Sequence, residues 1–324
     1  MRAVRCHDLT GPAGVRVDEV AEPEPGPGEV LVDVRAAAVN FPDVLLSYGK
    51  YQFRPQPPFV LGAEAAGVVR AVGAGVTAVA PGDRVAATVI HGAFAERILV
   101  PESAAVPLPA AVDFEVGAAT LLTYGTTFHA LVDRAALRPG ETLLVLGAAG
   151  GVGIAAVEVG HMLGARVIAA ASSDERLALC RAHGADEAIA YTREDLKTRV
   201  KELTGGDGVD VVYDPVGGPF AEPALRSIAW QGRYLVVGFA AGEIPRIPLN
   251  LALLKGCQIV GVFYGSFAAR DPARNRANAA QIFAAVADGR LRPHIDATLP
   301  FARAGEALTR MERRDVKGKL VLVP

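Results

Sequence analysis

Hydrophobic and polar residues alternate over short stretches in the first third of the chain. The segments 15–20 (VRVDEV), 29–37 (EVLVDVRAA) and 83–89 (DRVAATV) follow this pattern, and turns rich in proline and glycine separate them. Alternation with a period of two places one set of side chains on each face of a strand. Short strands at this spacing predict an antiparallel barrel or sandwich over residues 1–110.

From Val112 onward the pattern is that of helices and buried strands. Residues 113–137 predict a helix, a break and a second helix, with Asp113 as the N-cap and Gly125 near the break. Apolar strands and helices then alternate, which predicts a parallel, doubly wound sheet. The six expected strands are 142–147, 166–171, 187–191, 209–217, 233–239 and 257–267.

The last residues return to the β pattern of the first domain. A helix is expected near 273–289, and the tail 318–324 (GKLVLVP) is β-like. We therefore expect two domains, one made of residues 1–122 and 268–324 and the other of residues 123–267.

Composition and charge exclude several classes of protein. The chain has 324 residues, of which 51% are hydrophobic, and a net charge of −2 without a basic run, which argues against nucleic-acid binding. The three cysteines lie far apart and form no disulfide or zinc pattern. The first residues lack the apolar region of a signal peptide, and glycines and Glu158 interrupt the most apolar stretch, 142–160. These features predict a cytoplasmic protein that does not enter a membrane.

A glycine-rich turn, GAAGGVG (147–153), follows the first strand of the expected parallel sheet. In this position Gly150 would let the backbone approach a pyrophosphate, and Gly153 would let the next helix pack closely. Ala148 replaces one glycine of the dinucleotide-binding pattern. No Gly-Lys-Ser/Thr ending follows, which argues against a P-loop nucleotidase. A tight turn without a ligand is the alternative.

The end of the second strand of the expected sheet predicts which dinucleotide is bound. NAD-binding chains place an acid there, but this chain has Ala171, followed by Ser172, Ser173 and Arg176. Hydroxyls and a guanidinium suit a 2′-phosphate, so NADPH is favoured. Ser172 with Glu175 would also form a capping box, and the two roles are compatible. Asp174 would oppose a phosphate unless it points to solvent.

Several segments together resemble the zinc-free, NADPH-dependent quinone oxidoreductases (zeta-crystallin-like) of the medium-chain dehydrogenase/reductase superfamily. They are 39–51 (VNFPDVLLSYGKY), 61–69 (LGAEAAGVV), 124–131 (YGTTFHAL), 147–153, 213–218 (YDPVGG) and 316–322 (VKGKLVL). The resemblance implies an α/β protein: a Rossmann doubly wound parallel sheet plus a GroES-like β-barrel domain that the C-terminal tail completes. It also implies an active cleft between the two domains.

The same resemblance bears on metal binding. Zinc-dependent members of the superfamily have a ligand cysteine in the segment matched here by 40–43 and a ligand histidine in Gly-His-Glu, matched here by Gly62-Ala63-Glu64. Both ligand positions are lost, and the cysteines of the structural zinc lobe are absent. We therefore expect an enzyme that works without a metal.

The resemblance also implies residue roles. Asn40, Asp43 and Tyr51 are the catalytic candidates, with Asn40 and Tyr51 as hydrogen-bond donors to the acceptor, although Leu45 replaces a second tyrosine found in some quinone reductases. Core packing is the alternative role for Tyr51 and Tyr191. The residues expected at the cofactor are Asn40, Thr126, Gly150, Gly151, Val152, Gly153, Ser172, Ser173, Arg176, Tyr191, Val216, Gly238, Phe239, Phe263, Tyr264, Gly265 and Lys319.

These features together predict hydride transfer from NADPH to a quinone or enone acceptor without a metal. One alternative is an enoyl-thioester or α,β-unsaturated ketone reductase on the same scaffold. An alternative of another class is a non-catalytic NADPH-binding protein, either crystallin-like or redox-sensing. The apolar, β-branched segment 257–267 is an expected edge strand, and it predicts a homodimer formed by pairing of that edge.

Overall fold

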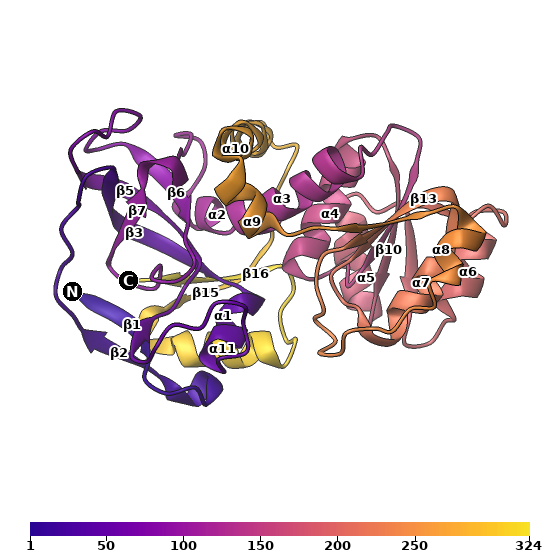
Figure 1. The fold of residues 1–324 in the computed structure, drawn as a ribbon, viewed down its shortest axis with the longest axis horizontal. Coiled ribbons are helices and arrows are strands. Elements are labelled where there is room, and N and C mark those ends of the chain that lie inside the picture. Colours follow the sequence, from indigo (N-terminus) through magenta and orange to yellow (C-terminus); the bar gives the residue numbers. More distant parts are fainter. The chain divides into compact units, whose positions relative to one another are not determined.

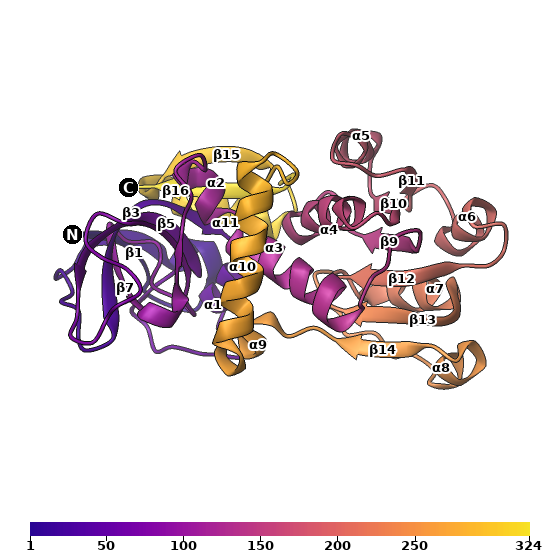
Figure 2. The ribbon, with the colours of Figure 1, turned by 90° about the horizontal axis from the view of Figure 1, so that it is seen from above.

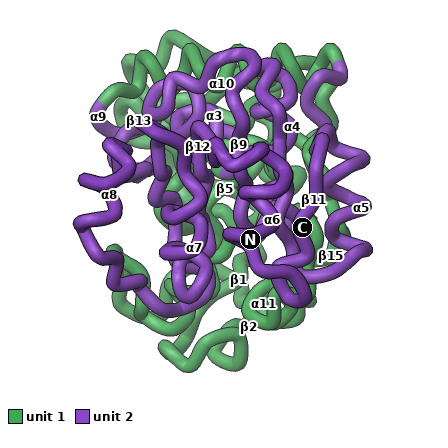
Figure 3. Tube along the Cα trace, turned by 90° about the vertical axis from the view of Figure 1, so that its right-hand side faces the viewer, with its two compact units in different colours: residues 1–122, 271–288, 293–324 green, residues 123–270, 289–292 purple.

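The computed structural model describes all residues from 1 to 324 and divides them into two compact units. Unit 1 comprises residues 1–122, 271–288 and 293–324, and unit 2 comprises residues 123–270 and 289–292 (Figure 3). The C-terminal part of the chain therefore completes the unit in which the chain begins.

Unit 1 is built on two sheets. A three-stranded sheet has the order β2-β1-β4, and a seven-stranded sheet has the order β15-β16-β3-β5-β6-β8, with β7 paired to β3 (Figure 1). All pairings are antiparallel except that of β15 with β16. The strands are β1 (Arg2–Cys6), β2 (Val15–Glu19), β3 (Glu29–Val39), β4 (Phe59–Val60), β5 (Glu64–Val72), β6 (Arg84–Thr88), β7 (Arg97–Pro101), β8 (Ala105–Pro107), β15 (Ile295–Pro300) and β16 (Lys319–Val323).

Four helices cover the sheets of unit 1: α1 (Phe41–Ser47), α2 (Phe114–Ala118), α10 (Pro272–Ala287) and α11 (Ala304–Glu312). Alanines line one face of the large sheet, and they let α2 and Phe283 of α10 pack closely against it. Asp113 stands at the N-cap of α2, as predicted, but its side chain makes no capping bond.

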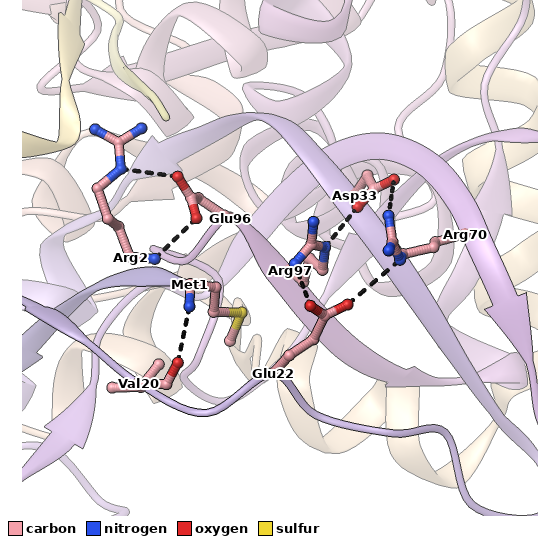
Figure 4. Close-up of polar contacts among 8 residues, drawn as sticks. All are labelled: Met1, Arg2, Val20, Glu22, Asp33, Arg70, Glu96 and Arg97. Atoms are coloured by element: carbon pink, nitrogen blue, oxygen red, sulfur yellow. Dashed lines mark hydrogen bonds and ion pairs between the residues drawn. The ribbon is translucent and has the colours of Figure 1, made fainter.

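Polar contacts at the surface of unit 1 involve strands β1, β3, β5 and β7, the segment that follows β2, and Glu96 just before β7 (Figure 4). Arg97 binds Glu22 at 2.5 Å and Asp33 at 2.9 Å, and Arg70 binds the same two carboxylates. Because these side chains are partly exposed, the pairs add little stability individually.

Unit 2 contains the predicted parallel sheet. Its six strands have the order β11-β10-β9-β12-β13-β14, and all neighbours are parallel. Figure 2 shows α4 on one side of these strands and α6 and α7 on the other, as in a doubly wound fold. The strands are β9 (Thr142–Leu146), β10 (Arg166–Ala171), β11 (Glu187–Ala190), β12 (Val209–Asp214), β13 (Ile228–Val236) and β14 (Gln258–Gly261).

The helices of unit 2 are α3 (Leu121–Phe128, which begins in unit 1), α4 (Gly151–Met162), α5 (Asp174–Ala182), α6 (Leu196–Leu203), α7 (Ala221–Arg226), α8 (Asn250–Lys255) and α9 (Tyr264–Arg270). A π-helical segment, His129–Arg134, continues α3. Short 3-10 turns lie in both units, at Gly11–Gly14, Glu102–Ala104, Gly218–Phe220 and Phe301–Arg303. No helix combines the length and apolar character needed to cross a bilayer.

Two predicted boundaries are wrong. The helical break lies at 119–120, and Gly125 is inside α3, where the Tyr264 hydroxyl would stand 2.5 Å from a Cβ at this position. A glycine is therefore required here by close packing and not by a turn. The expected edge strand 257–267 is also shorter: β14 ends at Gly261, and Tyr264 begins a helix.

Candidate active site

The first candidate site lies in unit 1, where β3 ends and α1 begins. Asn40 is the N-cap residue of α1, and its backbone N–H donates to Asp43 Oδ2 at 2.8 Å. An acid in the first turn satisfies an N–H that has no helical partner and faces the positive end of the helix. Local capping chemistry thus places Asn40 and Asp43 together.

The side-chain amide of Asn40 is held at both ends. Its Oδ1 accepts from Lys319 Nζ at 2.5 Å, and its Nδ2 donates to Glu64 Oε1 at 3.0 Å and to the Ala38 carbonyl at 3.1 Å. An ammonium only donates, and carboxylate and carbonyl oxygens only accept, so these partners fix which end of the amide is oxygen. Both N–H bonds of Asn40 therefore already have acceptors.

Asn40, Asp43, Glu64 and Lys319 form what we call the polar cluster. Lys319 Nζ lies 2.7 Å from Glu64 Oε1, and the Leu122 N–H donates to the other oxygen of Glu64 at 2.9 Å. The side chains of Lys319 and Glu64 are only 4% and 1% exposed. Charges that are buried this deeply require an opposite charge and hydrogen bonds, and the cluster supplies both.

Asp43 is the carboxyl of this cluster whose pKa is raised. Burial raises the pKa of its carboxyl to about 7, against the opposing effects of the Asn40 amide and the Lys319 charge. Its Oδ1 makes no hydrogen bond within the chain. A protonated Asp43 would thus have an O–H to donate.

Tyr51 is half-buried, and its hydroxyl has no hydrogen-bond partner within the chain. Burial and the negative charge of Asp43 raise its pKa, so the hydroxyl keeps its proton. Tyr48, three residues earlier, is used differently, because its hydroxyl donates to Glu312 at 2.6 Å. Tyr51 is therefore the tyrosine of this segment whose hydroxyl is available to a bound molecule.

The second candidate site is the glycine turn of unit 2. Gly150 is the N-cap of α4, with a φ of −82° that any residue adopts, and a Cβ there would meet only the Gly147 carbonyl, at 3.4 Å. A Cβ on Gly153 would stand 2.3 Å from the same carbonyl. Close packing therefore requires glycine at 153. No contact within the chain requires glycine at position 150. A pyrophosphate that lies on the half-buried first turn of α4, with Gly151 and Val152, would require glycine there.

The loop after β12 lies against this turn. The Asp214 carboxylate accepts from the N–H groups of Val216 and Gly217, both at 2.8 Å, and also binds the Tyr234 hydroxyl. Val216 Cγ2 would lie 2.8 Å from a Cβ on Gly147. Gly238 follows β13 and faces the Pro215 carbonyl, while Phe239 beside it is exposed. Val216, Gly238 and Phe239 thus gather where the strands end.

The residues expected at a 2′-phosphate gather after β10, which ends at the buried Ala171. Ser173 caps α5 by accepting from the Arg176 N–H at 3.4 Å, so the expectation that Ser172 is the cap was wrong. Ser172 is exposed, and its carbonyl accepts from Thr192. The Tyr191 N–H donates to the Ala171 carbonyl at 3.3 Å, which brings Tyr191 to the end of the same strand.

The remaining expected cofactor residues lie on or beside α3 and α9. Thr126 is half-buried on α3, and Tyr264 is buried where α9 packs on Gly125. Phe263 is 59% exposed, and Gly265 is exposed as well. Of these two aromatic side chains, Phe263 is the accessible one.

Comparisons with known proteins identify the family of the chain. Residues 26–110 match the alcohol dehydrogenase GroES-like domain, and residues 151–282 match the family described as zinc-binding dehydrogenase. The chain is 39% identical to a quinone oxidoreductase-like protein 2 homolog of Nematostella vectensis over 99% of this chain and 88% of that protein. It is 38% identical to a quinone oxidoreductase of Pseudomonas aeruginosa over 97% of both.

A solved structure gives the same result. The quinone oxidoreductase of Escherichia coli complexed with NADPH is 29% identical, with a TM-score of 0.94 over all of both chains. This chain belongs to the quinone oxidoreductase-like family of medium-chain dehydrogenases/reductases. It is an oxidoreductase with a GroES-like domain and a parallel sheet, and two of the similar solved structures are complexed with NADPH.

Within this oxidoreductase, no three His, Cys, Asp or Glu side chains come together in a way that would hold a metal ion. The position that matches the zinc-ligand cysteine is Asn40, bound to Lys319, and the position that matches the ligand histidine is the buried Ala63.

Three functional candidates of this oxidoreductase were missed in the sequence. Glu64 pairs with Lys319, Asp214 shapes the loop at Val216, and Arg193 binds Asp174. Asp214 and Glu64 lie within two of the motifs used in the sequence analysis, YDPVGG and GAE. Their partners lie far along the chain or across a loop, and no local pattern indicates them.

Proposed function

We propose that this protein is an NADPH-dependent reductase that transfers hydride to quinones without a metal ion. The observation that carries the proposal is the polar cluster: where zinc-dependent relatives have a ligand cysteine, this chain has an amide bound to a lysine ammonium. The Lys319 ammonium and a divalent cation would repel each other within this space. In zinc-dependent relatives the metal serves as a Lewis acid for the alcohol, whereas quinones are electrophilic without one.

The residues after β10 support NADPH as the cofactor. Ala171 removes the carboxylate that would repel a 2′-phosphate, and Ser172, Arg176 and Tyr191 lie at the end of the same strand. The Asp174 carboxylate is neutralised by Arg193. When bound, NADPH supplies the hydride. The glycine turn would bind its pyrophosphate through N–H groups at the start of α4.

The residues of unit 1 would act on the acceptor. Asn40 was expected to donate a hydrogen bond to the acceptor oxygen, but both of its N–H bonds are used by Glu64 and Ala38. The Tyr51 hydroxyl makes no hydrogen bond within the chain, so we assign it the role of donor to the acceptor oxygen. Asp43 has a raised pKa and an oxygen without a partner, so it would hold a proton near the Tyr51 hydroxyl.

The edge of the unit 2 sheet supports a homodimer. β14 has no neighbour on its outer side, and Ile259 on it is exposed. Leu253 and Leu254 of the preceding helix are 79% and 67% exposed. An apolar edge of this kind favours pairing with a second copy.

The test of the proposed function is steady-state NADPH oxidation with a panel of acceptors after exhaustive chelation. Benzoquinone and phenanthrenequinone should be reduced at an unchanged rate after chelation. In a separate assay with NADP⁺ as the hydride acceptor, ethanol should not be oxidised. Loss of quinone turnover on chelation, or alcohol oxidation alone, would overturn the proposal. Crotonyl-thioester reduction much faster than quinone reduction would assign the protein to enoyl-thioester reductases instead, and NADPH binding without any turnover would assign it a non-catalytic role.

A further inference from the structure

A cavity of about 280 Å³ lies at the surface of unit 1 and is open to solvent on one side. Its lining residues come mainly from β4, from β7 and from the loop that follows β6, and all of them belong to unit 1. Ligand cavities in proteins measure about 300–1,000 Å³, so this one suits a small molecule. None of the candidates for catalysis or cofactor binding lines it.

The walls of this cavity are mainly apolar. Phe59, Val60, Ile98 and Leu99 are among the residues that line it. Val60 and Leu99 are half-buried, so part of their apolar surface still contacts water. A ligand with an apolar body would remove this surface from water, which favours binding.

Arg97 is the charged side chain at the cavity. Its guanidinium binds Glu22 at 2.5 Å and Asp33 at 2.9 Å, and Arg70 binds the same two carboxylates (Figure 4). Two guanidinium groups thus face two carboxylates, and their charges balance. A charged ligand would lose its hydration here without gaining an uncompensated opposite charge, so a neutral ligand fits better.

His91 supplies a hydrogen-bonding group to the cavity. Its Nδ1 lies 3.2 Å from the Val60 carbonyl oxygen. Because a carbonyl oxygen only accepts, Nδ1 carries the proton, and Nε2 of the neutral ring is an acceptor. This Nε2 has no hydrogen-bond partner within the chain. A ligand that binds it must therefore bring its own donor.

The imidazole ring of His91 is held in place by its neighbours. The Phe53 ring is stacked on it, with centroids 5.8 Å apart and an interplanar angle of 20°. The Phe59 ring meets it edge-on, at 5.7 Å and 71°. Together with the bond from Nδ1, these contacts fix the orientation of the ring. A fixed acceptor lowers the entropy cost of binding, and an aromatic ligand matches such aromatic surroundings.

We propose that this cavity binds a small, uncharged aromatic molecule that carries a hydroxyl group, which is a phenol in chemical terms. The phenol O–H donates to His91 Nε2, and the ring packs against Ile98 and Leu99. This site is separate from the proposed function and does not depend on it, because the residues assigned to the cofactor and the acceptor lie elsewhere.

The test is an NMR titration of the full chain, labelled with ¹³C at the isoleucine methyl groups, with phenol as the probe. Phenol should shift the methyl signal of Ile98 in a saturable manner. Toluene has the same ring but no O–H, and it should bind about tenfold more weakly, the size of one hydrogen bond. Benzoate, which is charged, should also bind more weakly than phenol.

Two variants separate the hydrogen bond from the cavity. His91→Phe keeps an aromatic ring but removes the acceptor, so phenol and toluene should then bind equally. Leu99→Trp fills the cavity and should abolish the shift of Ile98 by both molecules, without any change at His91. Leu9→Trp is the control, because it adds the same ring at a side chain of unit 1 that is 43% exposed and does not line the cavity, and it should leave phenol binding unchanged.

Four outcomes would overturn the proposal. They are the absence of a saturable shift of Ile98, equal affinity of the unaltered protein for phenol and toluene, an undiminished preference for phenol in His91→Phe, and tighter binding of benzoate than of phenol.

Discussion

Arg193 binds both carboxylate oxygens of Asp174, at 2.9 Å and 2.5 Å. Asp174 begins α5 and Arg193 lies in the loop after β11, so the pair bridges two segments near the expected 2′-phosphate residues. The Arg193 guanidinium holds the pKa of Asp174 below its usual range. Both side chains are exposed, and such a pair contributes little to stability. Its consequence is electrostatic: a carboxylate that would oppose a phosphate is neutralised.

The first prediction concerns cofactor choice. Arg176→Ala should weaken NADPH binding by about 1.5–3 kcal/mol, the range for hydrogen bonds to charged groups, and leave NADH binding nearly unchanged. Fluorescence titration with both cofactors measures this. Arg226→Ala, which breaks an exposed pair with Glu222 on α7, is the matched control and should change neither. Equal losses for NADPH and NADH in Arg176→Ala would refute the assignment.

The second prediction separates the two glycines of the turn. Gly150→Ala should change the unfolding free energy by less than about 1 kcal/mol, because its Cβ meets no crowded atom. It should still weaken NADPH binding by roughly tenfold or more, because the Cβ stands where a pyrophosphate approaches. Gly153→Ala should instead destabilise the protein by about 1–3 kcal/mol through the contact with the Gly147 carbonyl. Urea unfolding and NADPH titration of both variants decide the matter. Unaltered NADPH affinity in Gly150→Ala would remove the pyrophosphate from this turn.

The sheet of unit 2 was predictable because each strand is a short apolar run between turn residues. The prediction of a helical break near Gly125 was wrong, because this glycine lies inside α3. Its place is set by Tyr264, whose ring occupies the space of a Cβ. Such packing across 139 residues leaves no local pattern in the sequence.

The polar cluster shows the same limit at the candidate site. Asn40 and Lys319 were identified through the resemblance, but their contact spans 279 residues and depends on the register of β16 with β3. The two N–H bonds of Asn40, expected to serve as donors to the acceptor, are both used within the chain, by Glu64 and Ala38. The glycine turn, in contrast, is built from seven consecutive residues, 147–153, and its geometry was accessible to sequence reasoning.

The third prediction is a pH dependence of stability. The pKa of Asp43 in the folded protein is about 7, above the ordinary value of 3.8, so the folded state holds the proton more tightly than the unfolded state. This contribution to stability is complete below about pH 4 and is lost as the pH rises through about 7. Asp43→Asn should remove that loss, which amounts to at most about 4 kcal/mol. Urea unfolding at several pH values measures it, and exposed Asp207→Asn is the control. Parallel pH profiles for Asp43→Asn and the unaltered protein would contradict the prediction.

The fourth prediction concerns assembly. The unaltered protein should be a dimer at micromolar concentration, and Leu253→Glu with Leu254→Glu should make it a monomer by placing charges on the exposed apolar face of α8. Light scattering measures the mass. Ile90→Glu alters another exposed apolar side chain, 57% exposed in unit 1, and should leave the dimer intact. A monomeric unaltered protein would exclude pairing at β14.

The fifth prediction assigns the hydrogen-bond donor for the acceptor. Tyr51→Phe removes a hydroxyl that has no partner within the chain, so stability should change by less than about 1 kcal/mol. Its kcat for quinone reduction should fall roughly tenfold or more, because the charge forming on the quinone oxygen loses a donor. NADPH binding should not change. Tyr48→Phe is the matched control from the same segment, and it removes a hydroxyl that binds Glu312 and should leave turnover intact. If Tyr48→Phe and Tyr51→Phe lowered kcat equally, the effect would come from the packing of α1, and the donor would have to be sought among the backbone N–H groups.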